Sequence, residues 1–126
     1  MGDLHQPLHV GCCDDQGGNK VKVSWFKHDT NLHHVWDSDM IDGTHLSYSE
    51  IAESLFYQSD EWYKKTKTVS IQDWAHEAMT YRKQLYDIGN ASLSYEYQYT
   101  HWPLVQAQLV KAGVRLALVL NTIYGE

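Results

Sequence analysis

The chain has 126 residues, which is enough for one domain with a modest hydrophobic core. Its formal net charge is −6, so we do not expect non-specific binding to nucleic acid through a basic face. We find no signal-peptide pattern, and the apolar runs are too short or too interrupted to predict a membrane span. Six of the eight histidines fall within the first 45 residues, so we expect the chemistry to lie in that part of the chain.

The first 45 residues predict loops, one short β element and one short helical segment. GDLHQPLH occupies positions 2–9, and the following residues end in the turn-rich run DDQGGN. KVKVSWF at 20–26 alternates apolar residues with charged or small ones, which predicts a short strand or half of a hairpin. NLHHVWDSDMI then forms a short helical or turn segment that closes at Asp42-Gly43.

Two amphipathic helices are predicted next. Ser47 and Glu50 form a capping box that opens the first helix, and Ser70 and Asp73 do the same for the second, which should stop at Gly89. The apolar residues expected on one face of the first helix are Ile51, Ala52, Leu55 and Phe56. Those of the second helix are Trp74, Ala78, Tyr81 and Leu85.

A long final helix is predicted with Pro103 near its start. VRLALVLNTIY at 114–124 is interrupted by Arg115 and Asn121, and it indicates a buried helix rather than a membrane span. The predicted apolar side consists of Leu109, Leu116, Leu120 and Ile123. The sequence therefore predicts a mainly α fold with one small β element, and residues 1–126 as a single unit without a linker or repeat.

NLHHVWD carries a candidate metal-binding pair. Residues three or four apart on a helix share a face, so either His33 or His34 could point at the same spot as Asp37. A tetrahedral zinc site needs a third protein ligand from elsewhere. GDLHQPLH offers Asp3, His5 and His9.

The histidines and cysteines also allow interpretations without a metal ion. A single His–Asp pair at helical spacing is more often a surface ion pair or a helix cap than a ligand set. Two His-rich segments close in sequence favour a metal site over those readings. The adjacent Cys12 and Cys13 do not predict a disulfide framework, and zinc-binding cysteines usually occur as CxxC. The histidines expected to be ordinary surface or structural residues are His28, His45, His76 and His101.

GDLHQPLHVG, DQGGN and NLHHVWDS together resemble the S1/P1 nuclease family, which are trinuclear zinc nucleases related to zinc-dependent phospholipase C. WAHEA at 74–78 and QLVKAGVRLALVLN at 108–121 continue the similarity in the same order. The resemblance implies a phospholipase C/P1 nuclease-like helical fold whose N-terminal part is absent, so the chain would be a partial domain.

The resemblance also implies a ligand set. His9, His33 and Asp37 match the three protein ligands of one zinc ion, and Asp3 matches the carboxylate that bridges the other two. Family members supply further ligands from an N-terminal Trp, three histidines and an aspartate, all upstream of the segment matched here. We therefore expect the 126-residue chain to hold about one complete zinc site and to have little nuclease activity alone.

Four further residues are placed by the resemblance. His5 and His34 are not ligands, and Asn19 is expected to shape the loop beside the site. Asp39 would face the substrate at a position where relatives often carry Asn or Gly, and its charge could repel a phosphate.

The activity implied by the resemblance is zinc-dependent hydrolysis of single-stranded RNA or DNA, giving 5′-nucleotides, and removal of phosphate from 3′-nucleotides. A secreted or periplasmic location is implied in the same way. Two alternatives stay open: a catalytically incomplete zinc-binding remnant, and a phosphodiesterase of the phospholipase C type.

Overall fold

The computed structural model describes residues 1–10, 14–66 and 69–125, so Cys12 and Cys13 lie outside the described residues. Most of the described chain is helical, as expected, and the strands are short. The helical elements in chain order are α1 (Gly2–His5), α2 (Leu32–His34), the π-helical turn η1 (Val35–Asp39), α3 (Met40–Asp42), α4 (Tyr48–Lys65), α5 (Ile71–Thr80), α6 (Arg82–Leu85) and α7 (Tyr95–Tyr124). The strands are β1 (Lys22–Trp25), β2 (His28–Asn31) and β3 (Ser92–Leu93).

The predicted strand is half of a hairpin. β1 and β2 pair antiparallel, with Lys22 opposite Asn31 and Trp25 opposite His28. The short β3 adds to the other edge of β1 in parallel, and the sequence did not indicate this strand. The hairpin leads directly into α2, so the sheet fixes the start of the NLHHVWD segment.

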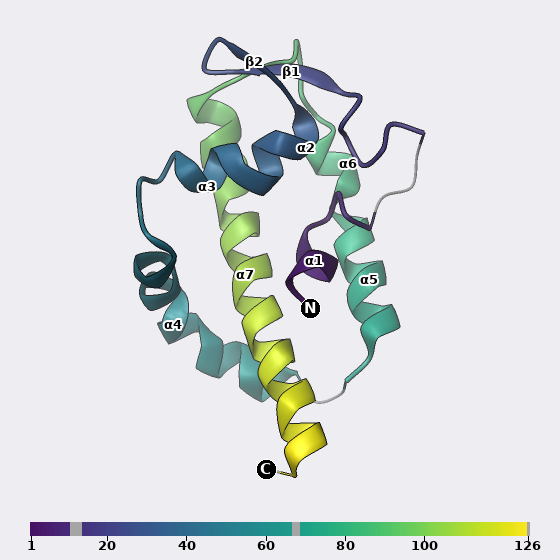
Figure 1. The fold of residues 1–126 in the computed structure, drawn as a ribbon, viewed down its shortest axis with the longest axis vertical. Helices are drawn as coiled ribbons and strands as arrows, with labels where there is room; N and C mark the ends of the chain where they lie inside the picture. The colour runs from purple at the N-terminus through teal and green to yellow at the C-terminus, as the bar shows by residue number, and fades with distance from the viewer. Residues whose placement is uncertain (11–13, 67–68, 126) are drawn as a thin grey trace.

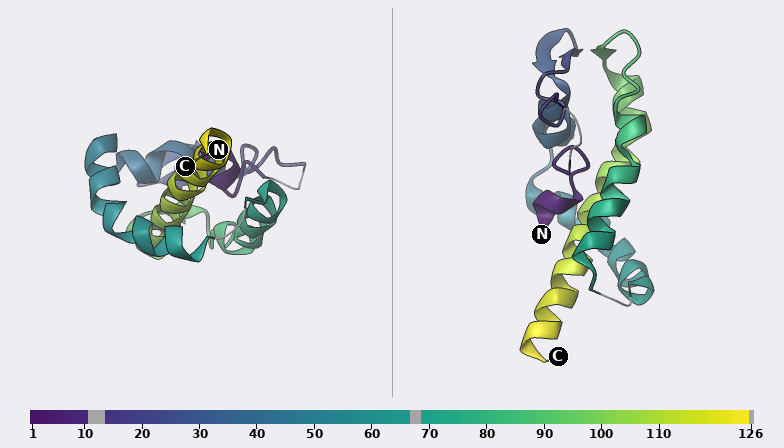
Figure 2. Two further views of the ribbon diagram at one scale, coloured as in Figure 1. Left: turned by 90° about the horizontal axis from the view of Figure 1, so that it is seen from below. Right: turned by 90° about the vertical axis from the view of Figure 1, so that its right-hand side faces the viewer.

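The elements lie in two layers at the end of the molecule that carries the sheet. In the side view of Figure 2, the N-terminal segment, the hairpin and α2–α3 form one layer, and α5, α6 and α7 form the other. The last turns of α7 project beyond the rest (Figure 1). The main hydrophobic cluster between the layers consists of Leu8, Val23, Leu32, Val35, Trp36, Met40, Leu85, Leu93, Tyr97 and Val105. A second cluster joins α4 to α7 through Ile51, Leu55, Val110 and Val114.

The predicted starts of α4 and α5 are confirmed, whereas their predicted buried faces are only partly confirmed. Ser47 and Glu50 form the reciprocal capping box of α4, and the Ser70 side chain accepts from the N–H of Asp73 at the start of α5. On α4, however, Ala52 and Phe56 are exposed. The predicted second helix is interrupted at Tyr81, where α5 ends and α6 begins.

The prediction for the final helix was wrong in its start and in its buried face. α7 begins eight residues before Pro103, which therefore lies inside the helix. The predicted apolar side, Leu109, Leu116, Leu120 and Ile123, is exposed. Residues 116–124 are exposed or half-buried, so the predicted buried helix at 114–124 is buried only at its first two positions. The physical reason is that α7 is apolar on several sides, and α1 and α4 cover other sides of it.

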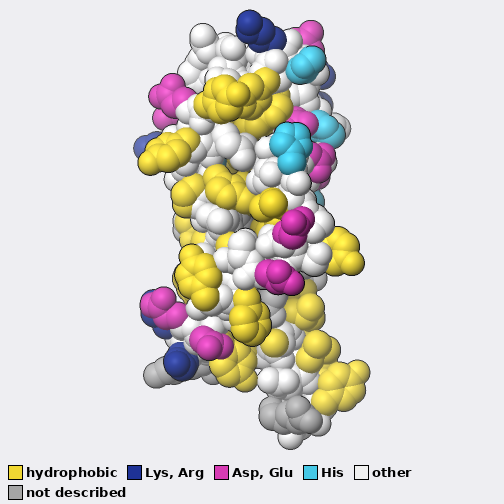
Figure 3. Space-filling view, turned by 90° about the vertical axis from the view of Figure 1, so that its left-hand side faces the viewer, with side chains coloured by type: hydrophobic (Ala, Val, Ile, Leu, Met, Phe, Trp, Pro, Cys, Tyr) yellow, Lys and Arg dark blue, Asp and Glu magenta, His cyan; other side chains and the backbone are white. Residues whose placement is uncertain are grey.

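α7 is long and apolar enough to span a membrane by length and composition alone, with a mean hydropathy of 1.3 over 18 residues. Core helices of folded proteins pass the same test. Here α7 contacts both α1 and α4, and it buries Lys111 and Arg115. The face of the molecule in Figure 3 shows apolar side chains along its whole length and histidines near its upper end.

Candidate metal centre

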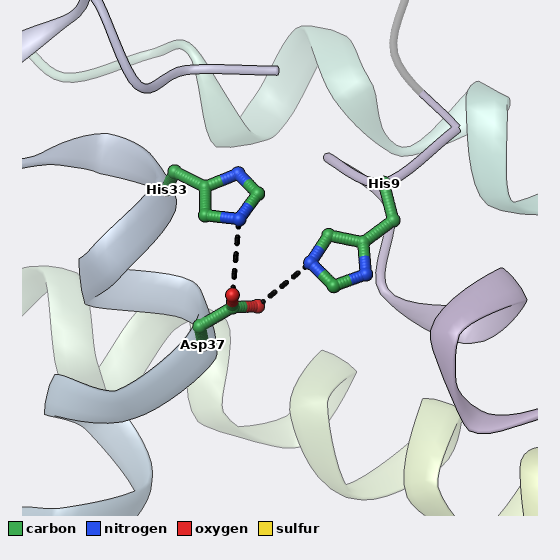
Figure 4. Close-up of side chains that lie close together, drawn as sticks. All are labelled: His9, His33 and Asp37. Atoms are coloured by element: carbon green, nitrogen blue, oxygen red, sulfur yellow. Dashed lines mark ion pairs between the residues drawn. The ribbon is translucent and has the colours of Figure 1, made fainter. Parts of the chain in front are cut away.

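His9, His33 and Asp37 bring one ligand atom each to within 4.8 Å of one another. The Asp37 carboxylate lies between the two rings, with Oδ1 3.0 Å from Nε2 of His9 and Oδ2 3.0 Å from Nε2 of His33 (Figure 4). The two imidazole rings stack with their centroids 4.9 Å apart. The side chains are 22%, 21% and 34% exposed, so a small ion could reach the group from solvent.

The other nitrogen of each ring already has a hydrogen-bond partner. Nδ1 of His33 lies 2.8 Å from the carbonyl oxygen of Gly17, which can only accept, so Nδ1 carries the proton. Nδ1 of His9 lies 2.7 Å from a carboxylate oxygen of Asp3, which favours the same tautomer. Nε2 of each ring is therefore the atom that faces the Asp37 carboxylate, at 3.0 Å in both cases. Two imidazole nitrogens and a carboxylate oxygen that converge in this way could bind one cation together.

The double glycine in DDQGGN allows the close approach that orients His33. Gly17 has φ of +64°, and a Cβ there would lie 2.5 Å from the carbonyl oxygen of Leu8. The loop is held by Asp15, which accepts from the N–H of Gly17 at 3.1 Å and from the Tyr86 hydroxyl at 2.6 Å. The tyrosine hydrogen bond lowers the pKa of Asp15. The loop thus ties the segment before His9 to the segment that carries His33.

Asp37 is held from two directions. Its Oδ1 accepts a hydrogen bond from the side-chain amide of Gln6 at 2.9 Å. On the core side, the preceding Trp36 is 3% exposed and donates to the Tyr97 hydroxyl at 2.9 Å. Asp37 lies in the π-helical turn η1, and single π-helical turns often occur at functional sites.

These residues suit zinc. Two ligands at 2.0–2.2 Å from a tetrahedral ion lie roughly 3.3–3.6 Å apart, close to the 3.0 Å that separates each Nε2 from Asp37. Two imidazole nitrogens and a carboxylate oxygen are a usual zinc donor set, and both rings donate their second N–H as zinc-bound histidines do. Three protein ligands leave a fourth position for water or substrate.

Comparison with known proteins places the chain in a family. The family model described as S1/P1 Nuclease matches residues 1–125. The chain belongs to the S1/P1 nuclease family. It is 35% identical to Endonuclease 2 and 33% identical to Endonuclease 1, both of Arabidopsis thaliana, over 99% and 100% of its length and 49% and 47% of theirs. It is 33% identical to Nuclease S1 of Aspergillus oryzae, over 98% of its length and 51% of that protein. The chain thus spans about half the length of these relatives.

The other residues named by the S1/P1 resemblance lie near the group without joining it. Asp3 is 82% exposed and contacts His9. Nε2 of His34 faces Asp39 Oδ1 at 3.4 Å, so His33 is the histidine that meets Asp37. The side-chain amide of Asn19 donates to the carbonyl of residue 16 within the glycine loop.

Asp39 is half-buried beside His34. Its side chain is 21% exposed, and burial raises the pKa of its carboxyl group. Oδ2 is buried without a hydrogen-bond partner among the described residues. The predicted contact with substrate stays a prediction.

Two sets of supporting residues were missed by the sequence reasoning. The Gln6 amide donates to Asp37, and the Gly17 carbonyl accepts from His33. In the sequence, only their position inside the quoted motifs could have indicated these two residues. The second set contacts His5, which is 2% exposed, through Arg115 and includes Glu77 of WAHEA. His101, expected among the ordinary residues, is buried between Trp36 and Tyr97.

Proposed function

We propose that residues 1–126 are the part of a zinc-dependent nuclease that holds one zinc ion with His9, His33 and Asp37. The whole protein would hydrolyse single-stranded RNA and DNA to 5′-nucleotides, and it would remove phosphate from 3′-nucleotides. The observation that carries the proposal is the convergence of Nε2 of His9 and Nε2 of His33 on the Asp37 carboxylate, with Nδ1 of each ring bonded to another group. Membership of the S1/P1 nuclease family and the names of the relatives support the reaction class.

Each residue of the group has a defined part in this proposal. His9 and His33 are held by Asp3 and Gly17 so that Nε2 of each ring stays available as a ligand. Asp37 supplies the negative charge that favours a divalent ion. A zinc ion bound there would neutralise a phosphate oxygen and lower the pKa of a bound water. This accounts for a phosphodiesterase with an acidic chain, because the positive charge that meets the phosphate need not come from lysines.

The chain alone should bind zinc but cleave little nucleic acid. Among the described residues, His9, His33 and Asp37 are the one group of His, Cys, Asp and Glu able to hold an ion together. Within residues 1–10, 14–66 and 69–125, Asp3 belongs to no other group of potential ligands, so the zinc bridge that the family resemblance implies would be incomplete. A secreted or periplasmic location of the whole protein belongs to the same proposal and follows from the family resemblance.

Zinc titration of the 126-residue chain tests the metal centre. We expect about one zinc per chain in competition with a chromogenic chelator, and loss of that binding in His33→Ala and in Asp37→Asn. His76→Ala is the matched control, since His76 is an exposed histidine on α5 that lies outside the group. A chain that binds zinc equally well after His33→Ala would refute the proposed site. Substantial zinc-dependent cleavage of single-stranded DNA by the chain alone would refute its incompleteness.

A further inference from the structure

A network of buried charged residues lies on the inner side of the first helix. Glu77 on α5 accepts from both Lys111 and Arg115 on α7. The Lys111 and Arg115 side chains are only 6% and 8% exposed, and that of Glu77 is 29% exposed. The Tyr81 hydroxyl lies 3.0 Å from Nζ of Lys111. The network therefore joins α5 to α7 through charged groups in a place where apolar residues could also pack.

The same network holds α1. Nη1 of Arg115 donates to Nε2 of His5 at 3.0 Å, and Nδ1 of His5 lies 2.9 Å from the carbonyl of Met1. The side-chain amide of Gln108 donates to the backbone carbonyl of His5 at 2.8 Å. The Arg115 guanidinium also lies over the Trp74 ring, 5.1 Å from its centroid. Thus the ring and the backbone of His5 are both tied to α7.

α1 leads directly to the metal-binding group. Asp3 lies two residues before His5 on the same short helix, and its Oδ1 lies 2.7 Å from Nδ1 of His9. Asp3 itself is exposed, so few contacts besides the placement of α1 fix its side chain. The orientation of the His9 ring therefore depends on where His5 is held.

Buried ion pairs give little net stability compared with apolar packing, because each charge must leave water. Their geometry is nevertheless directional, and so they suit a role in fixing one arrangement of the surrounding elements. Arg115 meets His5 through Nη1 and Glu77 through Nη2, whereas its Nε is buried without a partner in the part of the chain that the structure describes. The Arg115 guanidinium thus connects Glu77 on α5 with His5 on α1.

We propose that Glu77 and Arg115 are positioning residues for the metal centre: through His5 they place Asp3, which orients His9. The proposal rests on the zinc site described above. It assigns a task to the Glu of WAHEA and to the Arg of QLVKAGVRLALVLN, two motifs that lie far from the ligands in sequence.

Zinc affinity of the full 126-residue chain tests this proposal. Arg115→Lys keeps the positive charge but shortens the reach to His5, and Glu77→Gln removes the charge that holds Arg115. We expect either variant to weaken zinc binding about tenfold to a hundredfold, as loss of outer support does at other zinc sites. Glu61→Gln is the matched control, because it removes an exposed pair with Lys65 on α4 and should leave zinc affinity unchanged.

A double-mutant cycle separates positioning from a general loss of stability. In chains already carrying Asp3→Ala, Arg115→Lys should cost no further affinity, because its effect passes through the Asp3–His9 contact. The absorption spectrum of the Co²⁺-loaded chain should change in Arg115→Lys but not in Glu61→Gln. Far-UV circular dichroism shows which variants fold. If Glu77→Gln does not fold, Arg115→Lys alone tests the positioning role.

The outcomes distinguish the two proposals. A wild-type chain that binds no zinc would overturn both the metal centre and the positioning role. A wild-type chain that binds zinc, with a folded Arg115→Lys of equal affinity, would overturn the positioning role alone. An undiminished effect of Arg115→Lys in the Asp3→Ala background would do the same.

Discussion

Replacing Tyr97 by Phe should destabilise the fold through two buried hydrogen bonds. The Tyr97 hydroxyl donates to the carbonyl of Leu85 at 2.7 Å and accepts from Nε1 of Trp36 at 2.9 Å. Tyr97 is 7% exposed, and burial raises the pKa of its hydroxyl, which therefore stays protonated and able to donate. Tyr97→Phe leaves one buried acceptor and one buried donor without partners.

The size of the effect follows from those two groups. Each unsatisfied buried group costs about 1–3 kcal/mol, so for two groups we expect a loss of roughly 2–6 kcal/mol. A domain of this size is stable by about 5–15 kcal/mol, so the loss should be plainly visible. Urea unfolding followed by circular dichroism measures it as a lower midpoint with an unchanged slope.

Tyr99→Phe is the matched control for this measurement. It makes the same chemical change on α7, at a residue that is 85% exposed, and should leave the midpoint unchanged. A loss below about 1 kcal/mol in Tyr97→Phe would refute the reasoning, since it would mean that both groups find other partners at little cost.

Two other substitutions test the support of the site and the pH dependence of the fold. Gln6→Leu removes the amide that donates a hydrogen bond to Asp37. We expect zinc affinity to fall about tenfold to a hundredfold in a chelator competition. The control Gln58→Leu, at a position in α4, should leave zinc affinity unchanged. Burial lowers the pKa of His101 below its ordinary 6.5. As the pH falls below 6.5, the unfolded chain therefore binds a proton at this residue more readily than the folded chain does. Wild-type stability should therefore decrease below pH 6.5, and His101→Phe should make that decrease shallower in urea midpoints measured across the range; an equally steep decrease would contradict the assignment.

Local patterns in the sequence predicted the features that depend on a few neighbouring residues. The cap of α4 needs only Ser47 and Glu50, and the hairpin needs only the alternation in KVKVSWF. The His33–Asp37 contact is likewise a four-residue spacing, although the spacing alone did not exclude His34. Such features depend on residues within one helical turn or one pair of strands, so a short stretch of sequence is enough to predict them.

The buried face of α7 could not be predicted in that way. Arg115 interrupts an apolar run in the sequence, yet it is buried, while Leu116 and Leu120 are exposed. Hydrophobic periodicity reports which residues could be covered, but a helix that is apolar on several sides leaves the choice to its neighbours. The partners of Arg115 come from α5 and α1, 38 and 110 residues away in the chain.

The motif GDLHQPLH shows why a dense motif does not by itself identify ligands. Its inner residues, His5, Pro7 and Leu8, are buried against the core and the ion network, whereas Asp3 and His9 face the proposed zinc site. Gln6 lies between the two sets and reaches Asp37. One short segment thus meets a packing requirement on one side and a coordination requirement on the other, so its two histidines have opposite surroundings although they are four residues apart. A zinc assignment made from the histidine count alone would have included His5, and the geometry of its contact with Arg115 argues against that, because its Nε2 is already occupied by a guanidinium.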